Sequence, residues 1–358
     1  MASKLNILFT GATGYIGGEV FAKLLDHPKF STFNITALVR SPEKAEKLRA
    51  LQVQVVVGSH SDEPLMEKLA SEADIVIATA DADNVPAAKA TLRGLKKRYA
   101  ATKVPPTFIH TSGTGVLTDD AKGLYPTDTI YDDLNVVQLN SLPDTQFHRN
   151  VDLELLGGDE AGYVKTYIIL PSTIYGLASS KLVDLGIQNR HSVQIPHLIR
   201  AAIDRGRGGM VGPGKNIWPN VHITEIADVY MTVLNAILHN KNPGHGREGL
   251  YFGENGEYTM YQLAKRISEV LVELGLGKDS EPSPFTTEEI DKYFDGSLYM
   301  GTNSRCRANR ARALGWKPTK TTDDMLSSVK PEVEAILEER KRTGSLAVKP
   351  TAGYAATT

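Results

Sequence analysis

Three glycines near the start of the chain have a spacing that suits a phosphate-binding turn. Gly11, Gly14 and Gly17 follow a short apolar run at residues 4–10 and precede helical apolar spacing at residues 19–25. In a strand–turn–helix unit, the first glycine permits a tight turn and the second lets the backbone approach a pyrophosphate. The third lets the helix pack closely on the strand. The helix then presents free N–H groups and its positive dipole end. This motif predicts dinucleotide binding, and a glycine-rich turn without a ligand is the alternative.

Groups that could move a proton or hold an oxygen lie further along the chain. His148 and Asp152 are four residues apart, which would put both on one helix face. A carboxylate beside an imidazole orients the ring and favours one tautomer, so this pair could supply a proton; an ordinary surface pair is the alternative. The hydroxyls of Ser112 and Thr114 could bond a substrate oxygen, or only satisfy backbone groups. Tyr131 is a further candidate proton donor.

Composition narrows the class of protein. The 358 residues suffice for one or two domains, and 40 Lys plus Arg against 42 Asp plus Glu give a formal charge of −2. Nothing in this balance favours a nucleic-acid or membrane partner. Cys306 is the single cysteine, so no internal disulfide can form, and no Cys/His cluster predicts a metal site. No apolar run approaches the roughly 20 residues of a membrane span. We expect a cytoplasmic protein that acts on a small molecule.

Strand and helix patterns alternate through the first half of the chain. The strands are expected at residues 4–10, 34–39, 53–57, 74–79, 107–111 and 164–170. Helices are expected between them at residues 19–25, 43–50, 63–71, 84–103 and 146–156. The third strand is continuously apolar, as expected for a strand buried on both faces. Short connections between alternating strands and helices predict an α/β fold with a Rossmann-type, doubly wound parallel sheet.

The second half of the chain has a different pattern. Residues 113–143 are expected to form a long loop or lid with little regular structure. Helices are expected at residues 196–204, 224–238, 259–274, 310–316 and 322–342, with Thr224 capping the second of these. We therefore expect a nucleotide-binding domain at residues 1–176 and a smaller, mainly helical substrate lobe at 177–342, parts of which could return to the sheet. Residues 343–358 are small and polar and are expected to be disordered.

Several of these features recur in a fixed order. They are T-G-x-x-G-x-x-G at residues 10–17, a basic end to the second strand, a hydroxyl-rich end to the fifth, P-S-T-I-Y-G at 171–176 and V-H-I-T-E-I-A-D at 221–228. This order resembles the extended and atypical short-chain dehydrogenase/reductase family, which includes NAD-dependent epimerases and dehydratases. The resemblance implies an NAD(P)-binding Rossmann domain with the cofactor at the carboxyl ends of the strands. Family members often dimerise through Rossmann-domain helices, so a homodimer is a further expectation.

The resemblance also places the cofactor along the chain. The residues implied are Gly11, Thr13, Gly14, Tyr15, Ile16, Gly17, Arg40, Ser41, His60, Asp62, Thr79, Ala80, Asp81, Thr111, Pro171, Ser172 and Thr173. NAD-binding members usually end the second strand in an acidic residue, which holds the ribose 2′-hydroxyl. Arg40 stands there instead, followed by Ser41, and a guanidinium can pair with a 2′-phosphate. These residues predict NADP(H) in preference to NAD(H). The alternatives are a guanidinium that only stacks on the adenine and a solvated loop residue without a ligand.

The catalytic motif of the family is altered. Its reductases and epimerases use Tyr-x-x-x-Lys on the helix before the sixth strand, and this pattern occurs here only at residues 99–103 and 261–265. By placement, His148 and Asp152 replace the tyrosine and lysine. Three functions follow as hypotheses. The first is an NADP(H)-dependent oxidoreductase that moves a hydride to or from a carbonyl or alcohol carbon. The second is a non-catalytic redox sensor similar to the NmrA-like regulators, and the third is an epimerase or dehydratase with bound cofactor.

Overall fold

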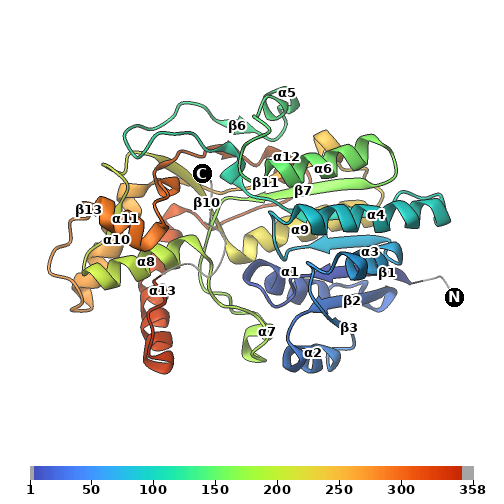
Figure 1. Cartoon of the computed structure of the whole chain (residues 1–358), viewed down its shortest axis with the longest axis horizontal. Coiled ribbons are helices and arrows are strands. Elements are labelled where there is room, and N and C mark those ends of the chain that lie inside the picture. Colours follow the sequence, from blue (N-terminus) through green and yellow to red (C-terminus); the bar gives the residue numbers. More distant parts are fainter. Residues whose placement is uncertain (1–3, 349–358) are drawn as a thin grey trace.

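The computed structural model describes residues 4–348, and its centre is a seven-stranded parallel sheet (Figure 1). The strand order is β11-β7-β5-β4-β1-β2-β3. The strands are β1 (Leu5–Thr10), β2 (Phe33–Val39), β3 (Gln54–Val57), β4 (Ile75–Ala78), β5 (Thr107–Thr111), β7 (Lys165–Pro171) and β11 (Leu250–Gly253). This arrangement confirms the predicted α/β class and the doubly wound sheet. All carboxyl ends of the strands therefore meet at one edge, where a nucleotide binds in such sheets.

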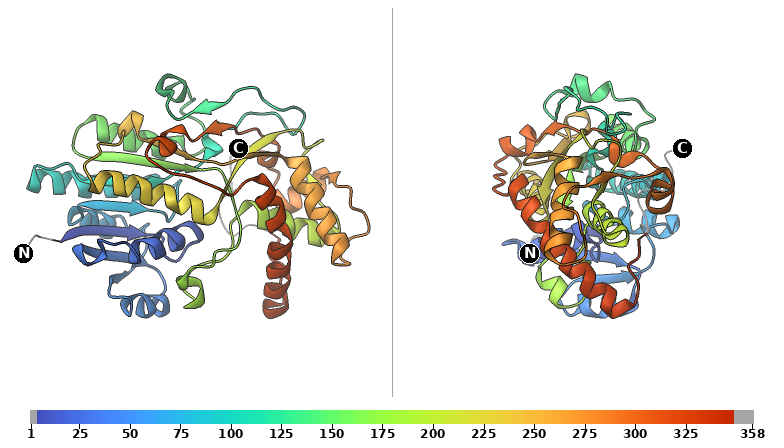
Figure 2. Two further views of the ribbon diagram at one scale, coloured as in Figure 1. Left: turned by 180° about the vertical axis from the view of Figure 1, so that it is seen from behind. Right: turned by 90° about the vertical axis from the view of Figure 1, so that its left-hand side faces the viewer.

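Helices cover both faces of the sheet. On one face, α1 (Tyr15–Leu25) packs against α9 (Ile223–Leu238). On the other, α4 (Val85–Thr102) lies between α3 (Glu63–Ser71) and α6 (Arg149–Glu160), as Figures 1 and 2 show. Helix α2 (Pro42–Arg49) packs beside β3 at the sheet edge. The parallel strands are covered on both sides, which buries their continuous apolar runs.

A second hydrophobic core lies beyond the carboxyl edge of the sheet. Its helices are α8 (Gln194–Arg205), α10 (Met260–Glu273), α11 (Thr287–Phe294) and α13 (Thr322–Thr343), which gather at one end of the molecule in Figure 1. The small sheets join β8 (Thr173–Tyr175), β10 (Ile217–His222) and β12 (Glu257–Thr259); β9 (Gly209–Met210) and β13 (Ser283–Pro284); and β6 (Tyr131–Asp132) and β14 (Cys306–Arg307). The short helices are α5 (Val136–Asn140), α7 (Lys181–Asp184) and α12 (Asn309–Ala313). We refer to this part as the C-terminal lobe.

The chain crosses between the two hydrophobic cores more than once. After α8, it returns to the sheet domain as α9 and again as β11, which pairs with β7 at the sheet edge. The boundaries at residues 176 and 342 stay predictions. The expected disordered tail at 343–358 lies, from residue 349 onward, outside the described residues.

Some local predictions were wrong. Strand β3 is the edge of the sheet, not a strand buried on both faces, and Val57 is 44% exposed. His222, not Thr224, caps α9, because its ring accepts the Thr224 backbone N–H. The expected loop at 113–143 contains β6, α5 and a 3₁₀ turn at Thr114–Leu117. Among the described helices, none is long and apolar enough to cross a membrane.

Candidate functional site

The glycine turn between β1 and α1 has the geometry of a phosphate cradle. Gly11 has a φ of +85°, and its carbonyl accepts the Gly14 N–H at 2.9 Å. Gly14 is the N-cap of α1 and offers no side chain, so the first N–H groups of the helix are uncapped. A Cβ on Gly17 would lie 2.2 Å from the Gly11 carbonyl oxygen. The turn therefore requires glycine at 11 and 17, and its open helix end fits a pyrophosphate.

Residues from distant segments hold this turn in place. The Thr79 hydroxyl donates to the Thr10 carbonyl at 2.7 Å, and Tyr15 donates to the Gly176 carbonyl at 2.5 Å. The Asn189 N–H donates to the Thr13 carbonyl at 3.1 Å. Ile16 follows in the first turn of α1 and is partly buried. Thr79 and Tyr15 thus use their hydroxyls to hold the turn within the protein. The Thr79 N–H also donates to the Thr10 carbonyl, and the Tyr15 carbonyl accepts a hydrogen bond from Gln188.

A cationic surface follows β2, the strand next to the glycine turn. Arg40 is exposed, and no hydrogen bond or ion pair joins it to the described residues. Ser41 caps α2 by accepting the Lys44 N–H at 3.3 Å. Lys44 itself is partly buried, and burial lowers the pKa of its ammonium group. Sequence reasoning missed Lys44. A lysine in the first turn of a helix is unfavourable beside the positive end of the helix dipole, and a bound anion would offset this. The position of Lys44 was therefore the available sign of an anion site.

The next two loops are joined by an imidazole–carboxylate pair. His60, after β3, places its Nε2 3.7 Å from the Asp81 carboxylate, and this contact lowers the pKa of Asp81. Asp62 caps α3 by accepting the Leu65 N–H at 3.1 Å, so its carboxylate already has a local role. Ala80 lies beside Asp81 after β4. The pair ties together the two loops that would border an adenosine group.

The predicted hydroxyls after β5 and β7 are bonded inside the protein. Thr111 donates to the Ala78 carbonyl at 3.0 Å and shares a hydrogen bond with the Tyr230 hydroxyl at 2.6 Å. Thr173 lies 2.9 Å from the Tyr258 hydroxyl and donates to Gln194 at 3.2 Å. These side chains fix the strand ends at which the cofactor cleft would lie.

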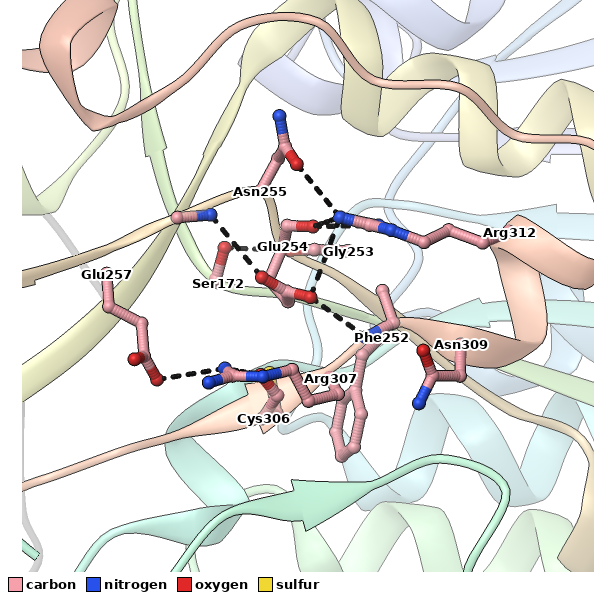
Figure 3. Close-up of polar contacts among 12 residues, drawn as sticks. Ser172, Phe252, Gly253, Glu254, Asn255, Glu257, Cys306, Arg307, Asn309 and Arg312 are labelled. Carbon is pink, nitrogen blue, oxygen red and sulfur yellow. Dashed lines mark hydrogen bonds and ion pairs between the residues drawn. The ribbon is translucent and has the colours of Figure 1, made fainter. Parts of the chain in front are cut away.

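Figure 3 shows how the end of β11 supports this edge. Ser172, directly after Pro171, donates its hydroxyl to the Gly253 carbonyl at 2.7 Å. Arg312 donates to the Glu254 carbonyl at 3.1 Å and to the Asn255 side chain at 2.8 Å. Helix α12 thus anchors the loop that directly follows Gly253, the acceptor of Ser172. The nearby Cys306 is fully buried, and burial raises the pKa of its thiol, so it stays protonated.

The predicted pair of His148 and Asp152 is not formed as expected. His148 precedes the first turn of α6 with a φ of +67°, so the four-residue rule for a helix face does not apply to it. Its Nδ1 lies 2.7 Å from the Asp83 carboxylate instead. Asp152 is fully buried and accepts a hydrogen bond from Ser112 at 3.1 Å. Burial raises the pKa of Asp152 to about 6.

The carboxylate that sequence reasoning missed is therefore Asp83. It lies just before Asn84, the cap of α4, in the segment Asp81-Ala82-Asp83-Asn84 after β4. The Nε2 of His148 faces Gly113, where an added Cβ would lie 3.0 Å away. The structure thus brings His148, Asp83 and the end of β5 together.

The described residues contain no cluster of three His, Cys, Asp or Glu side chains that could hold a metal ion.

Two further candidates have different surroundings. Thr114 is 1% exposed, and its Oγ1 has no hydrogen-bond partner among the described residues. A buried hydroxyl without a hydrogen-bond partner is unusual, and it could form a hydrogen bond with an oxygen atom of a bound ligand. Tyr131 lies on β6 and pairs with Cys306 on β14. Among residues 4–348, no hydrogen bond, ion pair or ring contact joins Tyr131 to His148. Thr114 therefore shares the neighbourhood of His148, whereas Tyr131 does not.

Comparisons with known proteins identify the nucleotide-binding part of the chain and its relatives. A family of NAD(P)H-binding domains matches residues 11–129. The oxidase UcsJ of Acremonium sp. is 30% identical over 337 residues, which cover 87% of this chain and 92% of that protein. An uncharacterized protein of Schizosaccharomyces pombe, C2A9.02, is 25% identical over 338 residues, with 89% and 96% covered.

Solved structures share the fold at lower identity. The UDP-glucose 4-epimerase of Thermotoga maritima has a TM-score of 0.60 at 17% identity, with 94% of this chain and 99% of that chain covered. The dTDP-glucose 4,6-dehydratase of Bacillus anthracis, solved with NAD, has a TM-score of 0.61 at 17% identity, with 96% and 99% covered. Together with the sequence relatives, the glycine cradle and the strand order, this establishes that the chain belongs to the extended short-chain dehydrogenase/reductase family and has its NAD(P)-binding Rossmann fold.

Proposed function

We propose that this protein is an NADP(H)-dependent oxidoreductase that transfers a hydride between the nicotinamide and a carbonyl or alcohol carbon of a small molecule. The observation that carries this proposal is the hydrogen bond of 2.7 Å between His148 Nδ1 and Asp83, at the carboxyl edge of the sheet. The bound cofactor would supply the hydride. The protein would position the substrate and manage one proton, and both contribute to the rate of such reactions.

In this proposal, His148 is the proton donor or acceptor. The Asp83 carboxylate orients the ring through Nδ1, which leaves Nε2 facing Gly113. The side chain of His148 is 12% exposed, so solvent can restore its proton. Asp152 has a different role: it fixes the position of Ser112, because its Oδ2 accepts a hydrogen bond from the serine hydroxyl. Thr114, with its unpartnered hydroxyl, is a candidate to bond the substrate oxygen.

Three residues at the start of α2 support the preference for NADP(H). Arg40 is exposed and uncommitted among the described residues, and a guanidinium binds a phosphate bidentately. Ser41 accepts the Lys44 N–H, and its hydroxyl proton remains available for a phosphate oxygen. Lys44 would add a second positive charge. The three residues directly after β2 are Arg-Ser-Pro, so the position that usually holds the ribose 2′-hydroxyl carries no acidic residue, and the first one is Glu43.

Titration of the protein with NADPH, NADP⁺, NADH and NAD⁺ tests this proposal. We expect NADPH to bind at least tenfold more tightly than NADH, about 1.4 kcal/mol. Arg40→Ala should remove most of that preference. Arg49→Ala, at the far end of the same helix, is the matched control and should leave it unchanged. Equal affinities for NADPH and NADH would contradict the cofactor assignment, and no binding at all would contradict the whole proposal.

A non-catalytic redox sensor is the second candidate. The observation that favours it is the missing Tyr-x-x-x-Lys pair on α6, where Arg149 and Asp152 occupy the first turn. A sensor should bind oxidised and reduced nucleotides differently and should turn over no carbonyl substrate. An epimerase or dehydratase is less consistent with Arg40, and a cofactor that co-purifies with the protein would favour it.

A further inference from the structure

The residue opposite His148 comes from the C-terminal lobe. A Cβ added to Gly115 would lie 2.6 Å from the Tyr299 hydroxyl oxygen and 3.3 Å from His148 Nε2. Because both distances are measured from one point, the phenol oxygen and the imidazole nitrogen lie no more than about 6 Å apart. Gly113 and Gly115 contribute no side chains to this space. The two polar atoms therefore border the same space beside the glycine backbone that follows β5.

Aromatic contacts fix the orientation of Tyr299. Its ring packs edge-to-face against Trp218, with centroids 5.4 Å apart, and against Phe147, with centroids 5.9 Å apart. Phe147 in turn packs on His148 at 3.8 Å. Such pairs restrict both position and tilt of the rings. The phenol and the imidazole thus both pack on the same phenylalanine.

Backbone contacts hold the segment that carries Tyr299. This 3₁₀ turn, Tyr299–Gly301, begins where the Tyr299 N–H donates to Ser297 at 3.2 Å. The Thr302 hydroxyl donates back to the Tyr299 carbonyl at 2.8 Å. Beyond it, Trp218 donates to the Thr302 carbonyl at 2.6 Å. The lobe therefore presents the phenol from a well-bonded turn.

The charges around Tyr299 keep it a hydrogen-bond donor. Burial, and then the nearby Asp83 carboxylate, raise the pKa of the phenol far above its usual value. The hydroxyl thus stays protonated at neutral pH, and it shares Asp83 as a neighbour with His148. In typical members of this family, a tyrosine on the helix that corresponds to α6 contacts the substrate oxygen. Tyr299 brings the same chemical group to this place from the opposite lobe.

We propose that Tyr299 is a catalytic residue whose hydroxyl contacts the reacting oxygen of a carbonyl or alcohol substrate, with His148 as its proton partner. This inference rests on the proposed function. In the reducing direction, a hydride adds to the carbonyl carbon, and the π-electron pair of the C=O bond moves to oxygen. That oxygen takes the phenolic proton of Tyr299. His148 enters this step as the imidazolium, with Nδ1–H on Asp83, and its Nε2–H returns a proton to the phenolate, which leaves a neutral imidazole. Solvent then reprotonates His148, so the net change is one hydride from the reduced nicotinamide and one proton from water.

The test compares two tyrosines of the same lobe. The wild type is mixed with NADPH and, in turn, phenanthrenequinone, nitrobenzaldehyde and cyclohexanone, and the fastest probe is kept. Tyr299→Phe retains the ring contacts and loses only the hydroxyl, so kcat should fall about 100-fold while KM stays within about threefold. Tyr293→Phe is the control, since the Tyr293 hydroxyl donates to Asp204 at 2.6 Å. Its kcat should stay within about twofold of the wild type.

Separate readouts distinguish the ways in which this could fail. The NADPH affinity and melting temperature of Tyr299→Phe should match those of the wild type. If the tyrosine were purely structural, the loss of kcat would come with a lower melting temperature or a weaker NADPH affinity. Gly115→Ala, which pushes a methyl group against the hydroxyl, should give a similar loss of kcat. If wild-type protein oxidises NADPH with none of the probes, the proposed function fails and this inference with it. If wild type and Tyr299→Phe turn over equally, the role of Tyr299 alone is wrong.

Discussion

The glycine turn and the His148 neighbourhood are built in opposite ways. The turn is made by backbone atoms within one short stretch, since Gly11, Gly14 and Gly17 lie between consecutive elements β1 and α1. The His148 neighbourhood is made by side chains from three distant segments. His148 and Asp83 are 65 residues apart, and Tyr299 comes from the C-terminal lobe. One region is local and depends on the absence of side chains; the other is non-local and depends on their presence.

This difference explains which parts of the family pattern persist. A backbone cradle has few solutions, because only glycine tolerates the φ of +85° at Gly11 and the close approach at Gly17. A proton-transfer site has many solutions, since different segments can bring an acid to the same place on one fold. We therefore expect changes in the turn to abolish binding, and changes near His148 to affect only the reaction.

The largest effect should come from the turn. Gly17→Ala would place a methyl group 2.2 Å from the Gly11 carbonyl and 2.3 Å from the Thr79 hydroxyl. Neither group can move freely, because the Thr79 hydroxyl is bonded to Thr10. We expect a loss of about 3 kcal/mol or more in the free energy of unfolding and no measurable NADPH binding. Urea denaturation and fluorescence titration measure the two. Gly157→Ala, on an exposed face with no neighbour near its Cβ, is the control.

A smaller effect, confined to the reaction, should come from His148→Phe. This change removes the partner of Asp83 and the proposed proton donor, so kcat should fall about 100-fold. NADPH affinity should stay within about threefold of the wild type, because the glycine turn is untouched. Steady-state kinetics with the fastest carbonyl probe measure this. Tyr131→Phe should leave kcat unchanged. If Tyr131→Phe lowers kcat and His148→Phe does not, Tyr131 is the proton donor and His148 has no part in the reaction.

The effect on the reaction should be smallest for the contact that joins the glycine turn to the C-terminal lobe, because this contact acts on stability. Glu332 on α13 accepts the Gly176 N–H at 3.0 Å, and the Gly176 carbonyl accepts the hydroxyl of Tyr15 in the glycine turn. Burial raises the pKa of Glu332 from 4.5 to about 7. The folded state therefore binds one more proton than the unfolded state between these values. The free energy of unfolding should fall as pH rises from about 4.5 to about 7, by on the order of 3 kcal/mol, and then stay level.

Glu332→Gln should remove this component of the pH dependence and raise stability at pH 8 relative to the wild type. Urea denaturation at several pH values measures it. Glu334→Gln, an exposed position on the same helix, should leave the curve unchanged. A wild-type curve whose slope persists in Glu332→Gln would show that other buried carboxyls, such as Asp133, account for the dependence.

The same contrast decides how much the sequence could predict. The alternation of strands and helices gave the sheet and the position of the glycine turn, because both follow from local pattern. Strand β11 was missed, because four apolar residues at 250–253 carry no sign that they pair with β7 far earlier in the chain. The partner of His148 was wrong for a related reason. The helix begins one residue after His148, and its positive φ turns the ring toward Asp83 instead of along the helix. Tyr299 could not be found at all, since only the packing of the C-terminal lobe brings it near Gly115.

The late return of β11 to the sheet has a consequence for how the protein is made. On the ribosome, β7 emerges with only β5 as a neighbour, and its other edge stays unpaired until residues 250–253 have been synthesised. During that interval the nascent chain exposes an apolar strand edge, which favours pairing with other chains. The protein should therefore depend more on chaperones during translation than a Rossmann domain whose strands are contiguous in sequence.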